Sequence, residues 1–173
     1  VTKSANDVAT AVAEKIAGTE INFAKRMTKK AKSLGMKNTR FMNASGLYNK
    51  YQKSTALDMA KLGIAIKRDF PLKYKIFNTK SFNWNGRKYK NHNNLLKSYS
   101  GTDGIKTGYI GASGFNLMAS VERNGIRLIG VVFGGKSSKR RDLHLMGLFT
   151  NAFKRASPPK IILVSTPLSC LLY

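Results

Sequence analysis

The residues TDGIKTGYIGA at 102–112 and GFNLMASVERNGIRLIGVVFGG at 114–135 decide the fold of this chain. In the second stretch, apolar side chains first alternate with polar ones and then form a run that is apolar on both faces. Asn124 and Gly125 stand between these two parts as a two-residue turn. We therefore expect an antiparallel strand pair whose second strand lies inside the sheet or beneath helices.

The helical spacing of apolar residues predicts four helices, at 8–16, 23–34, 56–68 and 138–153. Val8, Val12 and Ile16 mark one face of the first helix, and the last helix could cover the sheet through Leu143, Met146, Phe149 and Phe153. The pattern indicates an α/β chain of the α+β type, in which helices flank an antiparallel sheet.

A second strand pair is predicted between residues 73 and 90, where the short pieces YKIFN, KSFNW and KYK surround Asn85 and Gly86. An Asn-Gly pair between apolar runs is typical of a β-hairpin. NHNNLL at 91–96 follows as a loop, and we expect Asp103 to be a turn residue ahead of the next strand.

The charge of the chain is unusual for its size. Of its 173 residues 42% are hydrophobic, which suits one folded domain, but 31 basic residues face only 8 acidic ones, for a net charge of +23. Such a charge favours polyanions such as nucleic acid, anionic lipid or acidic cell-wall polymers. Because lysines recur through every segment, compositional bias is the favoured explanation and a polyanion site is the alternative.

Metal chemistry is not indicated by the sequence. Cys170 is the single cysteine, and His92 and His144 are too far apart in sequence for spacing alone to make them a pair. We expect no metal and no cofactor. No signal peptide is visible from Val1 onward, so either one was removed or the chain is part of a longer product.

We divide the chain into a body at 1–156 and an apolar tail at 157–173. The run IILVSTPLSCLLY in the tail is interrupted by Pro167 and is too short to span a bilayer. Three interpretations of the tail stay open: a peripheral anchor, a packed strand, or translated sequence outside the ancestral frame.

Several motifs, taken in the order in which they occur along the chain, resemble those of the low-molecular-mass penicillin-binding proteins of the D-alanyl-D-alanine carboxypeptidase family. They are SAN at 4–6, NASGLY at 43–48, NHNNLL at 91–96, TDGIKTGY at 102–109, and the strand pair at 114–135. The resemblance covers residues 2–155 and implies a penicillin-binding-protein or β-lactamase-like transpeptidase fold. The family's amino-terminal strands, its Ser-x-x-Lys helix and its carboxy-terminal β-rich domain have no counterpart in this sequence.

The resemblance implies catalytic roles for Ser4, Asn6 and Lys106. Ser4 would relay a proton toward the leaving D-alanine, and Asn6 would donate to the carbonyl of the bound peptide. Lys106 would place a positive charge near Ser4 and near the terminal carboxylate of the substrate. The alternatives are a helix N-cap for Ser4 and a solvated surface lysine for Lys106.

Four more residues are implied to bind substrate. Thr107 would hydrogen-bond the carboxylate, Gly108 would leave room for substrate beside the strand, and the amide of Tyr109 would be one of two oxyanion donors. His92 stands where many family members carry Arg, and a neutral imidazole binds a carboxylate less well than a guanidinium. An exposed loop histidine is the alternative for His92.

The nucleophile is the part of this chemistry that the chain does not supply. Its only Ser-x-x-Lys, from Ser157 to Lys160, follows KTG instead of preceding SAN, and two prolines between these residues forbid a helix interior. Loss of the nucleophile of a serine hydrolase costs about a million-fold in turnover. We predict that this polypeptide alone neither hydrolyses D-alanyl-D-alanine nor is acylated by penicillin.

The resemblance thus implies a serine-type D-Ala-D-Ala carboxypeptidase that acts on peptidoglycan stem peptides and binds β-lactams. An amino-terminal piece carrying Ser-x-x-Lys, either in the same precursor or as a separate chain that docks, would be needed for activity. The implied location is the periplasm or the outer face of the cytoplasmic membrane, with membrane association left open. The alternatives are a degenerate product of a split gene and a small basic polyanion-binding protein, for which nucleic acid is the less favoured ligand.

Overall fold

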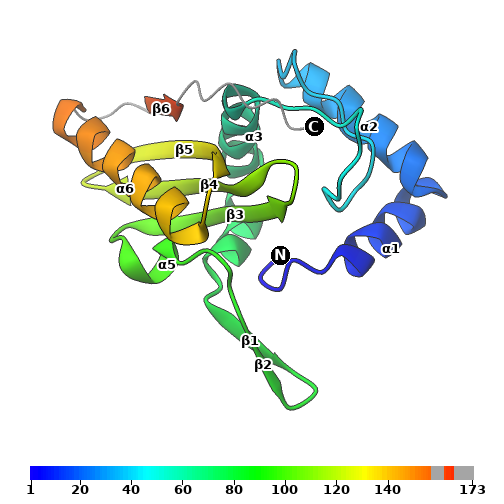
Figure 1. Ribbon diagram of the computed structural model, residues 1–173, viewed down its shortest axis with the longest axis horizontal. Helices are drawn as coiled ribbons and strands as arrows, with labels where there is room; N and C mark the ends of the chain where they lie inside the picture. The colour runs from blue at the N-terminus through cyan, green and yellow to red at the C-terminus, as the bar shows by residue number, and fades with distance from the viewer. Residues whose placement is uncertain (157–161, 166–173) are drawn as a thin grey trace.

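The structure is a computed structural model that describes residues 1–156 and the backbone of residues 162–165. In chain order the elements are α1 (Asn6–Ala17), α2 (Glu20–Ser33), α3 (Ala56–Asp69), α4 (Pro71–Tyr74), η1 (Lys75–Asn78), β1 (Ser81–Trp84), β2 (Arg87–Lys90), α5 (Leu95–Ser98), β3 (Thr102–Ile110), β4 (Gly114–Arg123), β5 (Ile126–Gly135), α6 (Ser138–Arg155) and β6 (Ile162–Ser165). Figure 1 shows their arrangement.

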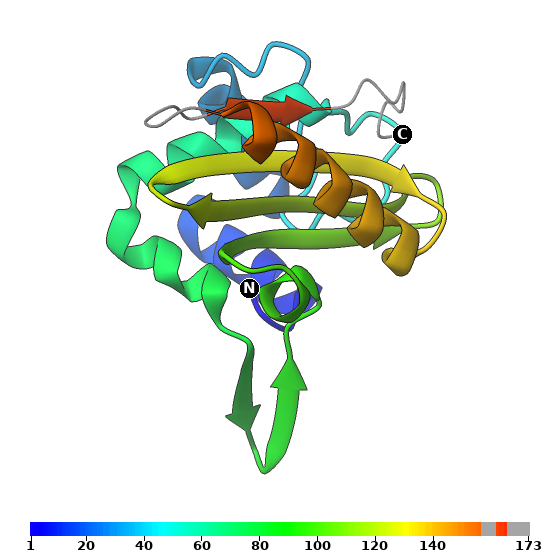
Figure 2. The same ribbon diagram turned by 90° about the vertical axis from the view of Figure 1, so that its left-hand side faces the viewer.

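A four-stranded sheet with the strand order β3-β4-β5-β6 forms the centre of the described part of the chain (Figures 1 and 2). β3, β4 and β5 are antiparallel neighbours, as predicted, and β6 runs parallel to β5. Asn124 and Gly125 form the predicted turn between β4 and β5, with φ values of 50° and 74°. Among the described strands, β3 therefore has one free edge.

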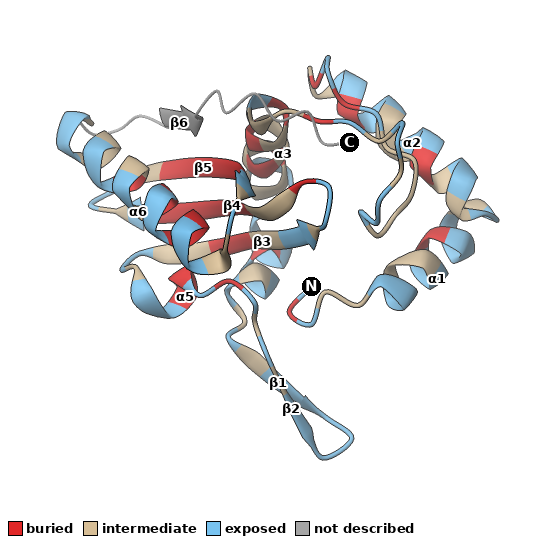
Figure 3. Ribbon diagram, viewed as in Figure 1, coloured by how far each residue is buried: buried red, intermediate tan, exposed pale blue. Residues whose placement is uncertain are grey.

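Helices cover both faces of this sheet. On one face, Leu145 and Phe149 of α6 pack into a core with β4 and β5. On the other face, Ala60 of α3 packs with Ile129 and Val131 of β5. β5 is thus the helix-covered strand that its sequence, apolar on both faces, predicts, and Figure 3 shows it buried along most of its length.

The first predicted helix is present, but its apolar face does not enter the core. Ala13 is its buried residue, and α1 packs chiefly on α2. The side chains of Val8, Val12 and Ile16 are 57%, 50% and 49% exposed. The predicted helix is therefore confirmed, but the described residues do not bury its apolar face.

Three expectations about particular segments are wrong. YKIFN, expected as a strand piece, contains the 3₁₀ helix η1. Asp103, expected in a turn, lies in β3, where its carboxylate accepts hydrogen bonds from Arg127 (2.7 Å) and Tyr74 (3.3 Å). In α6, Leu145 is fully buried, whereas Leu143 is 57% exposed. All three depend on partners distant in sequence, which a local pattern does not reveal.

β1 and β2 form the predicted hairpin, which projects from the body (Figure 1). In the tail, residues 162–165 form β6, while Ser157, Lys160 and the remaining tail residues lie outside those that the structure describes. None of the helices in the described ranges has the length and apolar character needed to cross a membrane.

Candidate active site

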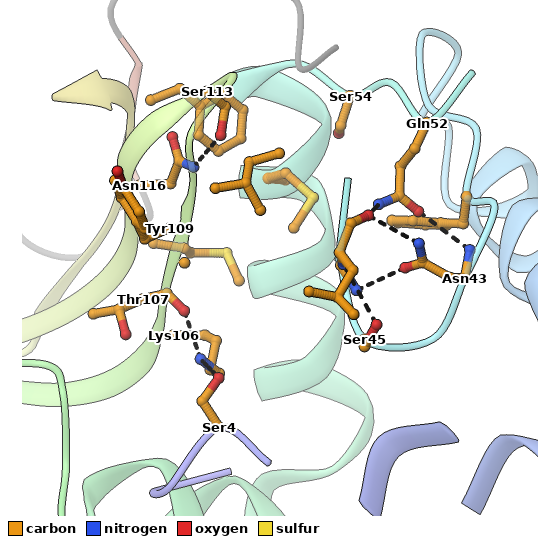
Figure 4. Close-up of a pocket in the computed structure, with 18 of the residues that line it drawn as sticks. Ser4, Asn43, Ser45, Gln52, Ser54, Lys106, Thr107, Tyr109, Ser113 and Asn116 are labelled. Carbon is orange, nitrogen blue, oxygen red and sulfur yellow. Dashed lines mark hydrogen bonds between the residues drawn. The ribbon is translucent and has the colours of Figure 1, made fainter. Parts of the chain in front are cut away.

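A pocket of about 320 Å³ lies between the start of α1, the edge strand β3 and the loop that follows α2 (Figure 4). Ser4 and Asn6 line it on the α1 side, and Lys106 to Tyr109 line it on the β3 side. Residues 43–47 of the NASGLY segment form a third side. The fold thus brings SAN and KTG, which are distant in sequence, onto one cavity.

Ser4 and Lys106 are in direct contact across this pocket, although they are 102 positions apart in the chain. The Lys106 Nζ donates to the Ser4 Oγ at 2.7 Å and also to the carbonyl oxygen of Thr107 (Figure 4). Ser4 has a left-handed backbone (φ 58°), which costs a non-glycine residue on the order of 1 kcal/mol. The N-cap of the helix is Ala5 and no side chain caps it, so the Ser4 hydroxyl does not cap the helix and instead lines the pocket.

Lys53 and Lys106 are the charged residues that line the pocket, and Lys106 is the more buried of the two. Burial lowers the pKa of its ammonium group below the ordinary value of 10.5. No carboxylate in the described residues forms an ion pair with Lys106, whose partners are a hydroxyl and a carbonyl oxygen. A partly buried cation of this kind is suited to bind an anionic group of a ligand.

Thr107, Gly108 and Tyr109, which the family resemblance implies as substrate-binding residues, line the pocket from β3 but differ in how exposed they are. Thr107 is half-buried, and the ring of Tyr109 is 62% exposed and packs against Phe115 with centroids 4.4 Å apart. A Cβ added to Gly108 would meet only Asn116, at 4.0 Å. The protein's own packing therefore does not require glycine at 108.

His92 is exposed and is not among the residues that line the pocket. Its pKa is nevertheless lowered, first by partial burial and then by the positive charges of Lys106 and Lys3. The imidazole is therefore near enough to sense Lys106 and is neutral at pH 7. The described residues contain no group of three or more His, Cys, Asp and Glu side chains that could hold a metal ion.

The loop wall of the pocket is built by amide side chains. The Asn43 Oδ1 accepts from the amide of Gly46 at 2.8 Å, and its Nδ2 donates to the carbonyl of Leu47 at 2.9 Å. The Gln52 Oε1 accepts from the amide of Met42 at 3.0 Å. The NASGLY motif indicates the first turn, but sequence reasoning missed Gln52, since only the tertiary structure brings it to Met42.

The far end of the pocket holds two residues that sequence reasoning also missed. Asn116 donates through Nδ2 to the Ser113 Oγ at 2.8 Å and accepts from the amide of Gly134 at 3.0 Å. Ser113 is buried at the turn between β3 and β4. These bonds fix the end of the strand pair next to Tyr109, and no local sequence signal marks them.

The chain matches the family model for D-alanyl-D-alanine carboxypeptidase over residues 1–137. It is 40% identical over 153 residues to D-alanyl-D-alanine carboxypeptidase DacA of Escherichia coli K12, covering 88% of this chain and 38% of that relative. DacF of Bacillus subtilis is 38% identical over 160 residues, covering 88% of this chain and 40% of DacF. The chain therefore spans less than half the length of these curated relatives.

Solved structures agree with these matches. Penicillin binding protein 5 from Haemophilus influenzae superimposes with a TM-score of 0.83 at 40% identity, over 87% of this chain and 44% of that protein. Penicillin-Binding Protein D2 from Listeria monocytogenes, in its cefotaxime-bound form, gives a TM-score of 0.81 at 30% identity, over 88% of this chain and 63% of that protein. Since both the sequence and the fold match over most of its length, the chain belongs to the D-alanyl-D-alanine carboxypeptidase family.

Proposed function

We propose that this chain forms two walls of the cleft of a serine-type D-Ala-D-Ala carboxypeptidase that acts on peptidoglycan stem peptides. The hydrogen bond between Lys106 and Ser4 carries the proposal, because it joins the KTG and SAN motifs at one pocket. Lys106, which has no ion-pair partner among the described residues, lies next to a hydroxyl and so supplies both an anion site and a proton path.

Substrate recognition in this proposal uses the free edge of β3. A stem peptide ends in a D-alanine carboxylate, which Lys106 binds by charge and Thr107 binds through its hydroxyl. The extended peptide lies along β3, where unpaired backbone groups at an edge strand bind a peptide as an added strand. The amide of Tyr109 then donates to the carbonyl oxygen under attack, where negative charge develops.

Proton transfer in the same site uses Ser4. When a serine attacks the scissile carbonyl, the proton that it loses has to reach the nitrogen of the departing D-alanine. The Ser4 hydroxyl accepts from Lys106 and can donate its own proton to that nitrogen, taking another from the lysine. The lowered pKa of Lys106 favours this transfer.

The attacking serine comes from outside this chain in the proposal, from an amino-terminal polypeptide that carries Ser-x-x-Lys. β-Lactams bind the same cleft, because they also present a carboxylate next to an acyl group. The enzyme acts where its substrate lies, in the periplasm or on the outer face of the cytoplasmic membrane. Without the serine, the chain binds but does not hydrolyse.

A second candidate, polyanion binding, is favoured by the way the charges are distributed. Six of the acidic residues in the described part bind other protein groups, namely Glu20, Asp58, Asp69, Asp103, Glu122 and Asp142. Most of the basic residues in the described part are exposed to solvent. Binding of an anionic wall polymer that weakens steeply with salt would support this function, and no binding at low ionic strength would exclude it.

Fluorescent penicillin tests the main proposal. The region of Escherichia coli DacA that precedes its match to this chain is fused ahead of Val1, and the rate of covalent labelling is measured. We expect labelling, slowed about tenfold to a hundredfold by Lys106→Ala, because a charge-assisted hydrogen bond contributes about 1.5–3 kcal/mol. The matched control is Lys97→Ala, an exposed lysine of α5, which should label at the parent rate. A folded fusion that takes no label, or one that Lys106→Ala does not slow, would contradict the proposal.

A further inference from the structure

The hairpin of β1 and β2 carries a row of aromatic side chains away from the central sheet (Figures 1 and 2). Its register pairs Phe82 with Tyr89 and Trp84 with Arg87, so these four side chains share one face of the two-stranded ribbon. The rings of Phe82 and Tyr89 stack with centroids 5.3 Å apart, and Trp84 near the tip is 71% exposed. Aromatic rings gathered on an exposed face mark a contact surface.

The hairpin is also strongly cationic. Lys88 and Lys90 lie on its second face, and both are exposed. Between Asp69 and Asp103 the sequence contains no acidic residue, and no basic side chain of the hairpin forms an ion pair among the described residues. The hairpin therefore combines an aromatic face with uncompensated positive charge, which attracts a ligand that carries anionic groups.

Hydrogen bonds fix the base of the hairpin to the strand that carries the KTG motif. The Asn91 Nδ2 donates to the carbonyl of Thr79 at 2.9 Å, and the Asn91 Oδ1 accepts from the amide of Asn93 at 2.9 Å. The Nδ2 of the buried Asn93 then donates to the carbonyl of Gly104 on β3 at 3.0 Å. The hairpin is thus held in a defined position relative to Lys106, which follows two residues later on β3.

A second contact links the hairpin to Ser4. The Lys3 Nζ lies 5.5 Å from the centroid of the Tyr89 ring, which is a cation–π distance. The next residue, Ser4, accepts from Lys106 in the candidate active site. A ligand on the hairpin and a ligand in the cleft can therefore be parts of one continuous molecule.

We infer that the aromatic face of the hairpin is a subsite for the glycan strand of peptidoglycan, which brings a polymer-borne stem peptide to the cleft. The face of an aromatic ring carries partial negative charge and packs on the polarised C–H bonds of a pyranose ring. The stem peptides along such a strand carry carboxylates, which Arg87, Lys88 and Lys90 attract. An anionic membrane surface would match the same side chains, but the polymer alone also uses the connection to the cleft. The inference rests on the proposed function and deepens it, since the polymer becomes a better ligand than a free stem peptide.

The test uses the fluorescence of Trp84, which is the only tryptophan of the chain. The 173-residue chain is titrated with N-acetylchitotetraose, a neutral glycan, and with soluble uncrosslinked peptidoglycan strands that carry stem pentapeptides. We expect both probes to move the emission to shorter wavelength, and calorimetry to show that the strands bind at least about tenfold more tightly than the free pentapeptide. No emission shift with either glycan, or equal affinities for the strand and the free pentapeptide, would overturn the subsite.

Two aromatic positions assign the binding to the hairpin. Trp84→Ala should weaken binding of both glycans about tenfold, and Trp84→Phe should recover most of the affinity because a ring remains. The matched control is Tyr51→Ala, which removes a 53% exposed ring outside the hairpin. Equal effects of Trp84→Ala and Tyr51→Ala would contradict the inference.

A charge-matched pair of variants tests the cationic part of the subsite. The double change Lys88→Glu and Lys90→Glu should weaken binding of the peptidoglycan strand more than the same double change at Lys25 and Lys29, two exposed lysines of α2. The two double variants have the same net charge, so equal effects would reduce the attraction to the overall charge of the chain and contradict a local site. Circular dichroism of each variant confirms that it is folded.

The outcomes also separate this inference from the proposed function, because glycan binding needs no nucleophile. Glycan binding by the chain, together with a DacA fusion that takes no penicillin label, would keep the subsite and contradict the function. Labelling of the fusion without glycan binding by the chain would overturn the subsite and keep the function. If Trp84 responds to phosphatidylglycerol vesicles and not to glycan, the hairpin contacts membranes and the inference is wrong.

Discussion

The Asp103 carboxylate on β3 and the Arg127 guanidinium on β5 are joined at 2.7 Å across the intervening strand β4. Arg127 also donates to the buried hydroxyl of Ser120 on β4, and Tyr74 donates to Asp103 from α4. Side chains from α4, β3, β4 and β5 thus meet around Asp103, which lies three residues before Lys106. This cluster fixes the edge strand that carries the KTG motif.

Asp103→Asn should lower the free energy of unfolding by about 1–3 kcal/mol, because it leaves the mostly buried Arg127 without its carboxylate on β3. Urea unfolding at pH 7 measures the change. Asp69→Asn is the control, since Asp69 pairs with the exposed Arg68 and exposed pairs contribute about 0–1 kcal/mol. Equal effects of the two variants would show that the cluster does not hold β3.

The buried ammonium of Lys106 should give the stability of the protein a distinct pH dependence. The pKa of Lys106 is lowered in the folded protein, so folding carries a burial cost at neutral pH, where the group is charged in both states. As pH rises through the lowered pKa toward 10.5, the folded protein releases the proton first and the free energy of unfolding increases. Lys106→Met should show a smaller increase over this window. Parallel curves for the two proteins would contradict the assignment.

His92→Arg should strengthen recognition of a carboxylate ligand. The lowered pKa of His92 keeps its imidazole neutral at pH 7, whereas a guanidinium there would carry a fixed charge near Lys106. In the DacA fusion, we expect the rate of penicillin labelling to rise about two- to fivefold, the range for a solvent-exposed pair. His144→Arg, an exposed change on α6, should have no effect. An unchanged or lower rate for His92→Arg would exclude His92 from the cleft.

The contact between α6 and β5 predicts opposite effects for two glycine substitutions. A Cβ at Gly130 would lie 2.6 Å from Leu145 Cδ1 and 2.9 Å from Phe149 Cζ, so Gly130→Ala should destabilise the protein by about 1–3 kcal/mol. A Cβ at Gly147 meets nothing within 4 Å inside α6. Gly147→Ala should therefore be neutral or stabilise by up to about 1 kcal/mol. Thermal unfolding that ranks Gly130→Ala as the more stable variant would contradict this packing.

Elements set by local chemistry could be predicted from the sequence. Both Asn-Gly turns, the strand pair at 114–135 and the helix that begins after Thr55 are present, and the Thr55 Oγ1 accepts from the amide of Asp58 as an N-cap does. The family resemblance carried by the SAN and KTG motifs implied that Lys106 lies near Ser4, and both residues line one pocket. In each case, the signal lies within a few residues or in an ordered motif.

Features set by distant partners could not be predicted in this way. Helical spacing gives the apolar face of α1, but it does not say whether Val8 and Val12 are covered. Asn93 is buried because its Nδ2 donates to the carbonyl of Gly104 at 3.0 Å, a contact that the NHNNLL motif does not show. Asp103 is ionically paired for the same reason, since Arg127 comes from another strand.

In the proposed enzyme, this chain supplies two walls of the cleft and an amino-terminal segment supplies the nucleophile. The most direct measurement incubates the 173-residue chain alone with a fluorescent penicillin and separates the products on a denaturing gel. The predicted result is no labelled band, because the described residues that line the cleft include Ser4, Lys106 and Thr107 but no serine of a Ser-x-x-Lys helix. A labelled band at the mass of the chain, 19.1 kDa, would contradict the account.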